Sequence, residues 1–282
     1  MDEARRQEIL TNLRARIRAQ ELGVRPSGPI PTLRFGVAEI DTALPGGGLA
    51  LGAVHEVCGG GPDLIHGAAA AGAAAAGFAA GILARTIGPI IWVVSRKDLF
   101  APALADVGLH SDRAIYVEAE DSKTTLLVIE EALRHVGLAG VVGEISGKMG
   151  LTASRRLQLA AEGSGVLGLL LRRPRRLGQD DTDDPTAART RWRVTATPSG
   201  PALSWSPSTP GLARARWQLE LLRCRGGEPR TFSVEACDAQ GRLGLPADRA
   251  NLSAAASHSA PPRDETLNHS FSKPASSFIA IK

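Results

Sequence analysis

The sequence predicts an α/β fold of three layers, in which helices cover both faces of a mainly parallel β-sheet. Two patterns support this prediction. From residue 35 to about residue 171, short apolar runs of strand length alternate with longer helical patterns, the order of consecutive βαβ units. Beyond residue 190, apolar and polar residues alternate singly, as in antiparallel strands that extend a sheet. With 282 residues, 43% of them hydrophobic, the chain can bury one large core.

An amphipathic basic helix is predicted ahead of the core, within residues 3–22. Its apolar face carries Ile9, Leu13 and Ile17, and arginines occupy the other faces. The sequence RPSGPIP at residues 25–31 ends this helix and predicts an extended linker. A helix tethered in this way can dock on a partner or on a second copy of the chain, or fold back on its own core. The sequence favours neither arrangement.

The end of the chain has a different composition. From about residue 246 it is rich in Ser, Ala and Pro, which cannot bury a core and predicts a disordered tail. The chain is therefore expected to consist of a helix, a linker, an α/β core and a tail. These parts correspond to residues 1–25, 26–34, 35–245 and 246–282.

Within the core, the expected strands are short apolar runs, and the helices between them show a longer period. The strands are predicted at residues 53–57, 90–95, 114–119, 140–146 and 166–171. The helices are predicted at residues 66–86, 98–107, 122–136 and 151–163. Because βαβ crossovers are right-handed, this order predicts a doubly wound sheet.

Antiparallel strands are predicted after the polar loop RRPRRLGQDDTDDPTAART. A half-exposed strand begins near Trp192, and a hairpin follows on either side of the sequence CRGGEPR. The apolar residues of the hairpin are expected to oppose one another across it. They are Trp217, Leu219 and Leu221 in its first strand and Phe232, Val234 and Ala236 in its second.

The stretch HEVCGGGPDLIHGAAAAG at residues 55–72 has the layout of a phosphate-binding loop. A working loop of this kind also needs a lysine on the β- and γ-phosphates and a Ser or Thr hydroxyl on magnesium. With Gly59 as the first glycine, Ile65 takes the lysine position and His66 the hydroxyl position. Starting one or two glycines later restores neither group. We therefore expect no ATPase activity, no catalytic residue and no bound cofactor.

The segment before this loop, LRFGVAEIDTALPGGGLALGAVHEVCG, resembles the RecA core just ahead of its Walker A loop. In RecA-like ATPases the second core strand ends near a catalytic glutamate, but here Ser95, Arg96 and Lys97 follow it. The resemblance implies a RecA-like fold with Glu144 at the position of the Walker B acid. The remnant of the nucleotide loop then comprises Gly59, Gly60, Gly61, Ile65, His66 and Glu144.

Among proteins with a RecA-like core, the chain resembles the ImuA family over roughly residues 30–240. The resemblance lies in the sequence HEVCGGGPD in place of a P-loop, and in the segments RRPRRLG, TRWRVTATPS and PGLARARWQLELLRCRGG. It implies a damage-inducible, non-catalytic accessory factor of error-prone translesion DNA synthesis. The implied partners are an ImuB-like, polymerase-related protein and an error-prone C-family DNA polymerase, with RecA or a second copy of the chain as further candidates.

Contact with single-stranded DNA is a further candidate role. The resemblance to RecA implies that residues 146–150 and 172–189 face the DNA axis. The arginines expected to contact DNA phosphates or a partner there are Arg172, Arg173, Arg175 and Arg176. Four aspartates follow directly, and these either repel the DNA backbone or pair with the arginines. The sequence leaves DNA contact and a solvated loop equally open.

Composition bears on the partners, the redox state of the cysteines, metal binding and membrane insertion. The net charge of +4 specifies no partner by itself. Three widely spaced cysteines predict reduced thiols in the cytoplasm and no metal site. The uncharged run at residues 67–84 is mostly Ala and Gly and predicts a buried helix rather than a membrane span. A cytoplasmic protein, associated with the nucleoid when it acts on DNA, is expected. Two other functions stay open: a regulator of RecA filaments, and a cell-division inhibitor like SulA.

Overall fold

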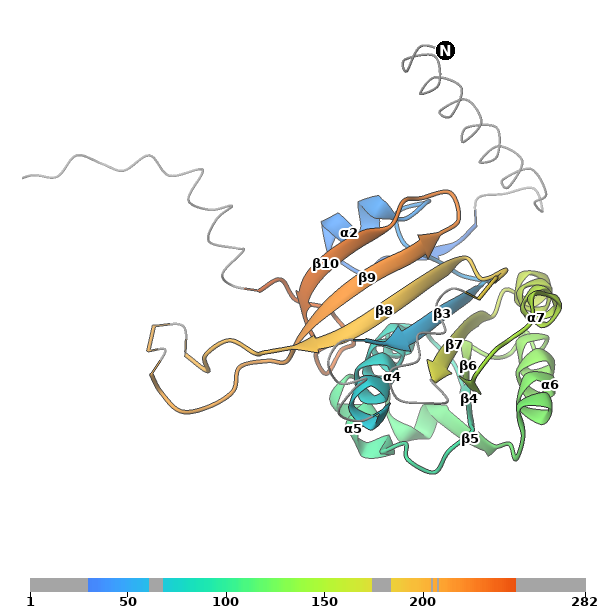
Figure 1. Ribbon diagram of the computed structural model, residues 1–282, viewed down its shortest axis with the longest axis horizontal. Helices are drawn as coiled ribbons and strands as arrows, with labels where there is room; N and C mark the ends of the chain where they lie inside the picture. Colours follow the sequence, from blue (N-terminus) through green and yellow to red (C-terminus); the bar gives the residue numbers. More distant parts are fainter. Residues whose placement is uncertain (1–29, 61–67, 174–183, 204, 207, 247–282) are drawn as a thin grey trace, which may run out of the picture. The chain divides into compact units, whose positions relative to one another are not determined.

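The computed structural model describes residues 30–60, 68–173, 184–203, 205–206 and 208–246 (Figure 1). The predicted docking residues Ile9, Leu13 and Ile17, and almost all of the predicted tail, lie outside the described residues. The described part begins with β1 (Thr32–Leu33), which pairs antiparallel with β2 (Leu49–Ala50). Part of the predicted linker is therefore a strand. Its pairing partners, Leu49 and Ala50, lie 16 and 18 residues further along the chain, beyond the reach of a local sequence pattern.

Eight of the described strands form one sheet in the order β10-β9-β8-β3-β7-β6-β4-β5. Six neighbouring strands are parallel, and β9 and β10 extend the sheet antiparallel at one edge. The strands are β3 (Val54–Gly59), β4 (Ile90–Val94), β5 (Ala114–Glu118), β6 (Gly140–Ser146), β7 (Leu167–Arg173), β8 (Thr190–Thr197), β9 (Arg216–Cys224) and β10 (Arg230–Glu235). This arrangement confirms the predicted parallel sheet with antiparallel strands added toward its C-terminal part. The strand near Trp192, predicted as antiparallel, differs: as β8 it pairs parallel with β3 and antiparallel with β9.

Helices cover both faces of this sheet (Figure 1). One face packs against α4 and the other against α6 and α7, and each side has its own apolar core. The described helices are α2 (Ala38–Ala43), α4 (Ala68–Ala84), α5 (Ala101–Asp106), α6 (Ser122–Leu133) and α7 (Leu151–Ser164), with a short 3-10 turn at Ser111–Arg113. None of the described helices is long and apolar enough to cross a membrane.

The small residues of α4 let it lie close to its neighbours. A Cβ atom at Gly77 would lie 3.4 Å from the ring of Trp217, and one at Gly81 would collide with Cys237. Phe78 and Leu83 on the same helix are fully buried. Residues 72–84 of the uncharged run therefore belong to a largely buried helix, as predicted, and close packing explains their composition.

The hairpin has most of the predicted pairing. Leu219 opposes Phe232 and Trp217 opposes Val234. Leu221 faces Arg230 instead of an apolar residue, and Ala236 lies beyond the end of β10. The predicted helix at residues 122–136 ends earlier, at Leu133, and its start is capped by the carboxylate of Asp121.

Candidate functional site

The candidate site lies at the carboxyl edge of the parallel strands, where α/β proteins place their ligand sites. β3 ends here in the glycine turn of the predicted nucleotide loop. Gly60 donates its N–H to the carbonyl of Val194 at 3.0 Å, and a Cβ atom at Gly60 would lie 2.5 Å from Cγ of Arg193. Close packing against β8 therefore requires glycine at this position. Gly61, Ile65 and His66 lie outside the described residues.

Glu144 lies within β6 and is fully buried. Its carboxylate accepts a hydrogen bond from the indole N–H of Trp92 at 3.3 Å and forms an ion pair of 3.0 Å with Arg173 of β7. Arg173 also pairs with Asp98, which follows β4. One guanidinium thus bridges the carboxylate at the Walker B position and a second carboxylate from the neighbouring strand end. Both carboxylate oxygens of Glu144 are therefore engaged by groups of the protein itself.

Arg172 points to the opposite face of the sheet from Arg173. It donates to the carbonyl of Gly147 at 2.9 Å, forms an ion pair of 3.3 Å with Asp184, and is buried. The pairing of an arginine with a following aspartate, which the sequence had left open, is therefore present. Arg172 and Arg173 are held by groups of the protein itself, and their contact with a DNA phosphate stays a prediction that requires these internal pairs to open.

Arg175 and Arg176 lie outside the described residues. Contact between this loop and DNA therefore stays a prediction.

Buried polar contacts tie β3 to β8 beside this site. Glu56 is fully buried, accepts a hydrogen bond from the Thr186 hydroxyl at 2.8 Å and pairs with Arg191 at 2.6 Å. These contacts satisfy the charge of a carboxylate that would otherwise be costly to bury. Glu56 of the HEV sequence therefore has a structural role in joining β3 to β8.

His55, the other polar residue of the HEV sequence, is also buried. Its Nε2 lies 2.8 Å from the carbonyl of Ala50, and its Nδ1 lies 2.7 Å from the hydroxyl of Thr190. Burial lowers the pKa of His55 to about 4, against the weaker opposing effect of the hydrogen bond to Ala50. A neutral ring with Nε2–H toward the carbonyl fits these contacts. His55 therefore links β3 to Ala50 and to Thr190 of β8 as a neutral ring at neutral pH.

The three cysteines lie in the interior of the protein. Cys58, Cys224 and Cys237 are free and buried. Burial raises the pKa of the Cys237 thiol to about 12 and also raises that of Cys224. Thiols with raised pKa values are unreactive at neutral pH. In the described part of the chain, no group of three or more His, Cys, Asp and Glu residues is arranged to hold a metal ion.

An apolar pocket of about 430 Å³ lies beside the candidate site, between α4, α5 and β9. Arg173 and Asp98 form one side of it, and Trp217 and the exposed ring of Phe100 form others. Most of its lining is apolar, which suits an apolar group better than the phosphates of a nucleotide.

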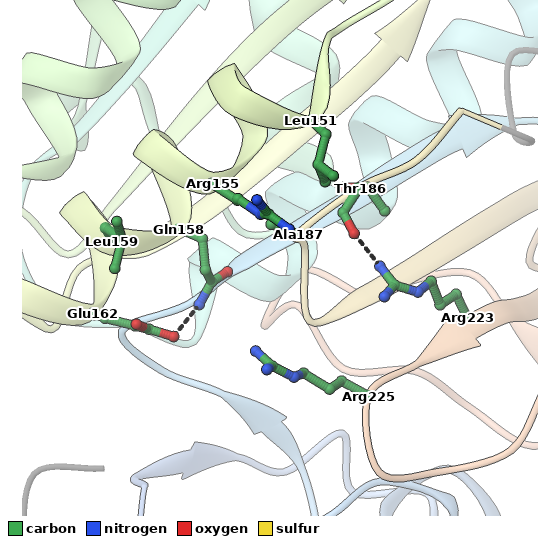
Figure 2. Close-up of a pocket in the computed structure, with 9 residues that line it drawn as sticks. All are labelled: Leu151, Arg155, Gln158, Leu159, Glu162, Thr186, Ala187, Arg223 and Arg225. Carbon is green, nitrogen blue, oxygen red and sulfur yellow. Dashed lines mark hydrogen bonds between the residues drawn. The ribbon is translucent and has the colours of Figure 1, made fainter. Parts of the chain in front are cut away.

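A second pocket, of about 340 Å³, lies on the other face of the sheet, between α7, the segment before β8 and the end of β9 (Figure 2). It contains Arg155, Arg223 and Arg225, none of which the sequence patterns had identified. Its residues come from segments about 70 positions apart, so the pocket exists only in the folded chain.

Known proteins were compared with this chain in sequence and in structure. No protein-family model matches the chain. Protein ImuA from each of two strains of Caulobacter vibrioides is 43% identical over 223 residues, which cover 78% of this chain and 88% of the relative. Among solved structures, the crystal structure of the RadB recombinase matches with a TM-score of 0.50 and 16% identity, over 76% of this chain and 99% of that chain. At this identity the likeness shows the fold alone, and it confirms the predicted RecA-like architecture.

Proposed function

Because the chain belongs to the ImuA family, we propose that it acts as a non-catalytic adaptor in damage-induced mutagenesis. In this role it supports translesion synthesis together with an ImuB-like, polymerase-related protein and an error-prone C-family DNA polymerase. It works in the cytoplasm, and at the nucleoid when its partners are engaged on DNA.

The bridging of Glu144 and Asp98 by Arg173 is the observation that carries the non-catalytic part of this proposal. A P-loop ATPase keeps an acid at the Walker B position available for magnesium and a lysine for the phosphates. Here the acid is neutralised by an internal arginine, and Ile65 stands at the lysine position. A magnesium ion at Glu144 would have to displace the Arg173 guanidinium from the carboxylate.

ATP turnover by the full chain tests this part of the proposal. Radiolabelled ATP with magnesium is expected to give no hydrolysis above the level of a buffer blank. The Glu144→Gln variant lacks the acid that the resemblance assigns to magnesium. It is expected to give the same blank-level signal, because the wild-type chain has no turnover to lose. Magnesium-dependent turnover that Glu144→Gln abolishes would refute the non-catalytic role.

The adaptor part is tested by capture of partners. Immobilised full-length chain is expected to retain a purified ImuB-like protein, and deletion of residues 1–25 is expected to abolish this binding if the N-terminal helix is the docking element. Retention of the partner by the shortened chain would exclude the helix and leave docking to the core. Failure of the intact chain to retain either partner would overturn the adaptor role.

The alternative of a single-stranded DNA or RecA-filament regulator has less support. Two of the four arginines that suggested it, Arg172 and Arg173, make internal contacts. A salt-sensitive affinity for oligothymidine that is lost when Arg175 and Arg176 are replaced by Ala would favour that alternative over the adaptor.

A further inference from the structure

The pocket drawn in Figure 2, called here the arginine pocket, is assembled from three segments of the chain. One wall is a face of α7, the floor is the chain leading into β8, and the opposite wall is the end of β9 with the following turn. Its lining residues are Leu151, Arg155, Gln158, Leu159, Glu162, Thr186, Ala187, Arg223 and Arg225.

A β-bulge directs two of the arginines into this pocket. Along β9, Trp217, Leu219 and Leu221 point to the α4 side of the sheet and belong to its core. The pairing with β8 then shifts: Trp192 opposes Leu221, but Arg191 opposes Arg223, so that Leu222 is an extra residue. Because side chains alternate along a strand, the extra residue turns Arg223 and Arg225 to the α7 side and returns Cys224 to the core.

The backbone at Arg225 is fixed on both sides. Its N–H donates to the carbonyl of Arg189 at 2.8 Å. Gly226 follows with a φ of 83°, and a Cβ atom at Gly227 would lie 2.8 Å from the sulfur of Cys224 and 3.1 Å from the carbonyl of Ala43. The turn therefore holds Arg225 over the pocket at little further entropic cost on binding.

The arginine pocket carries more positive than negative charge. Its only carboxylate, Glu162, accepts a hydrogen bond from Gln158 at 2.9 Å. Arg223 donates one Nη to the carbonyls of Thr186 and Ala188. Arg155 and Arg225 form no ion pair with any residue in the described ranges, and Figure 2 shows the three guanidinium groups around one opening. Unpaired guanidinium groups in a concave site are strong, bidentate receptors for carboxylates.

Apolar side chains border these charges. Leu159 is 65% exposed and Leu151 is 36% exposed, both on the face of α7 that lines the pocket. A ligand with an acidic group next to an apolar one would contact both kinds of residue. Single-stranded nucleic acid fits less well, because the described lining has no aromatic ring on which a base could stack.

We infer that the arginine pocket binds an acidic segment of a protein partner, in which Asp or Glu side chains pair with Arg155 and Arg225 and a neighbouring aliphatic side chain packs on Leu151 and Leu159. This inference deepens the adaptor role, on which it rests for the identity of the partner. The recognition chemistry itself, carboxylate on arginine beside apolar contact, depends only on the pocket.

Fluorescence anisotropy on the full-length chain tests the inference with two probes. One is a short fluorescein-labelled peptide of Asp, Glu and Leu residues, and the other is a labelled oligothymidine of equal charge. The peptide is expected to bind, more weakly as salt rises. Arg225→Glu and Arg155→Glu are each expected to weaken it by about tenfold or more, since a charge-assisted hydrogen bond contributes at least that factor.

Two further variants test whether peptide binding depends on the guanidinium group of Arg225 and on its position in the pocket. Arg225→Lys keeps the charge but loses the bidentate fork, and it should weaken the peptide less than Arg225→Glu. Arg230→Glu is the matched control: Arg230 is exposed and opposes Leu221, so it projects from the other face of the same sheet, and its replacement should leave the affinity unchanged. A thermal melt of each variant checks that it folds. If Arg225→Glu unfolds, the test of the pocket relies on Arg155→Glu, because Arg155 lies at an exposed position of α7.

The outcomes separate this inference from the adaptor proposal. Peptide affinity that both charge reversals leave unchanged overturns the inference, as does oligothymidine binding that depends on Arg225 while the peptide fails to bind. Capture of the ImuB-like protein by wild type and by both variants equally also overturns it, although the adaptor role then stands. Arginine-dependent peptide binding without capture of either polymerase-type partner supports the pocket and rejects the proposed partner.

Discussion

Arg173 of β7 lies diagonally across from Glu144 of β6, with its Nη1 3.0 Å from the carboxylate Oε2. Glu144 is paired in register with Leu171, two residues before Arg173, so the two side chains project from the same face of the sheet. Both are largely shielded from solvent, with side-chain exposures of 0% for Glu144 and 11% for Arg173. The residue that the resemblance aligns with the Walker B acid is therefore part of an internal ion pair in this chain.

Replacing Arg173 alone should lower the stability of the folded chain. Arg173→Ala leaves Glu144 buried without its cation and is expected to lower the free energy of unfolding by about 3–5 kcal/mol. Urea denaturation followed by tryptophan fluorescence measures this change. The double variant Arg173→Met with Glu144→Leu removes both charges and should recover most of the loss. A single variant with wild-type stability would mean that Glu144 is not held by Arg173.

The glycine at position 60 is expected to serve packing and not phosphate binding. Gly60→Ala places a Cβ atom 2.5 Å from Cγ of Arg193 and 2.6 Å from Oγ1 of Thr195, so we expect a loss of about 1–3 kcal/mol in stability. Gly163→Ala, within α7, is the control, because a Cβ atom there meets nothing within 4 Å. Equal melting temperatures for the two variants would contradict a packing role for Gly60.

Much of the fold could be predicted from the sequence because its signals are local. Strand-length apolar runs such as residues 140–146 correspond to β6, and the alternation around Trp217 and Leu219 predicted apolar residues facing one another across the hairpin. Long-range contacts could not be predicted in this way. The strand at Thr32–Leu33 depends on its pairing with β2, and so it was interpreted as part of a linker.

The candidate site was less predictable, since its chemistry depends on which distant residues meet. Glu144 was identified from a resemblance, but its neutralisation by Arg173 depends on the register of β6 and β7. The arginine pocket depends on the bulge at Leu222, which no periodic pattern indicates, because a bulge interrupts the alternation on which such patterns rely.

The cysteines should resist alkylation in the folded protein. Burial raises the pKa of Cys237 to about 12, so almost none of this thiol is ionised at pH 8. Native chain treated with iodoacetamide at that pH is expected to gain little label on Cys237 by mass spectrometry. The same treatment in concentrated urea should label all three cysteines, since unfolding restores ordinary thiol pKa values. Rapid labelling of native Cys237 would show that this thiol is not buried.

Stability should fall in acid as His55 becomes charged. Its pKa is about 4 in the folded chain and 6.5 for an unperturbed histidine, so the unfolded state binds the proton first. The stability that comes from keeping this ring neutral is fully present above pH 6.5 and is lost progressively as the pH falls toward 4, by about 3 kcal/mol in all. Urea midpoints measured across this range should therefore decrease with pH. His55→Gln should flatten the dependence, whereas His110→Gln, at an exposed position, should preserve it. If the His55 variant kept the wild-type slope, the acid sensitivity would have to come from other groups, and the neutral ring between Ala50 and Thr190 would not be its cause.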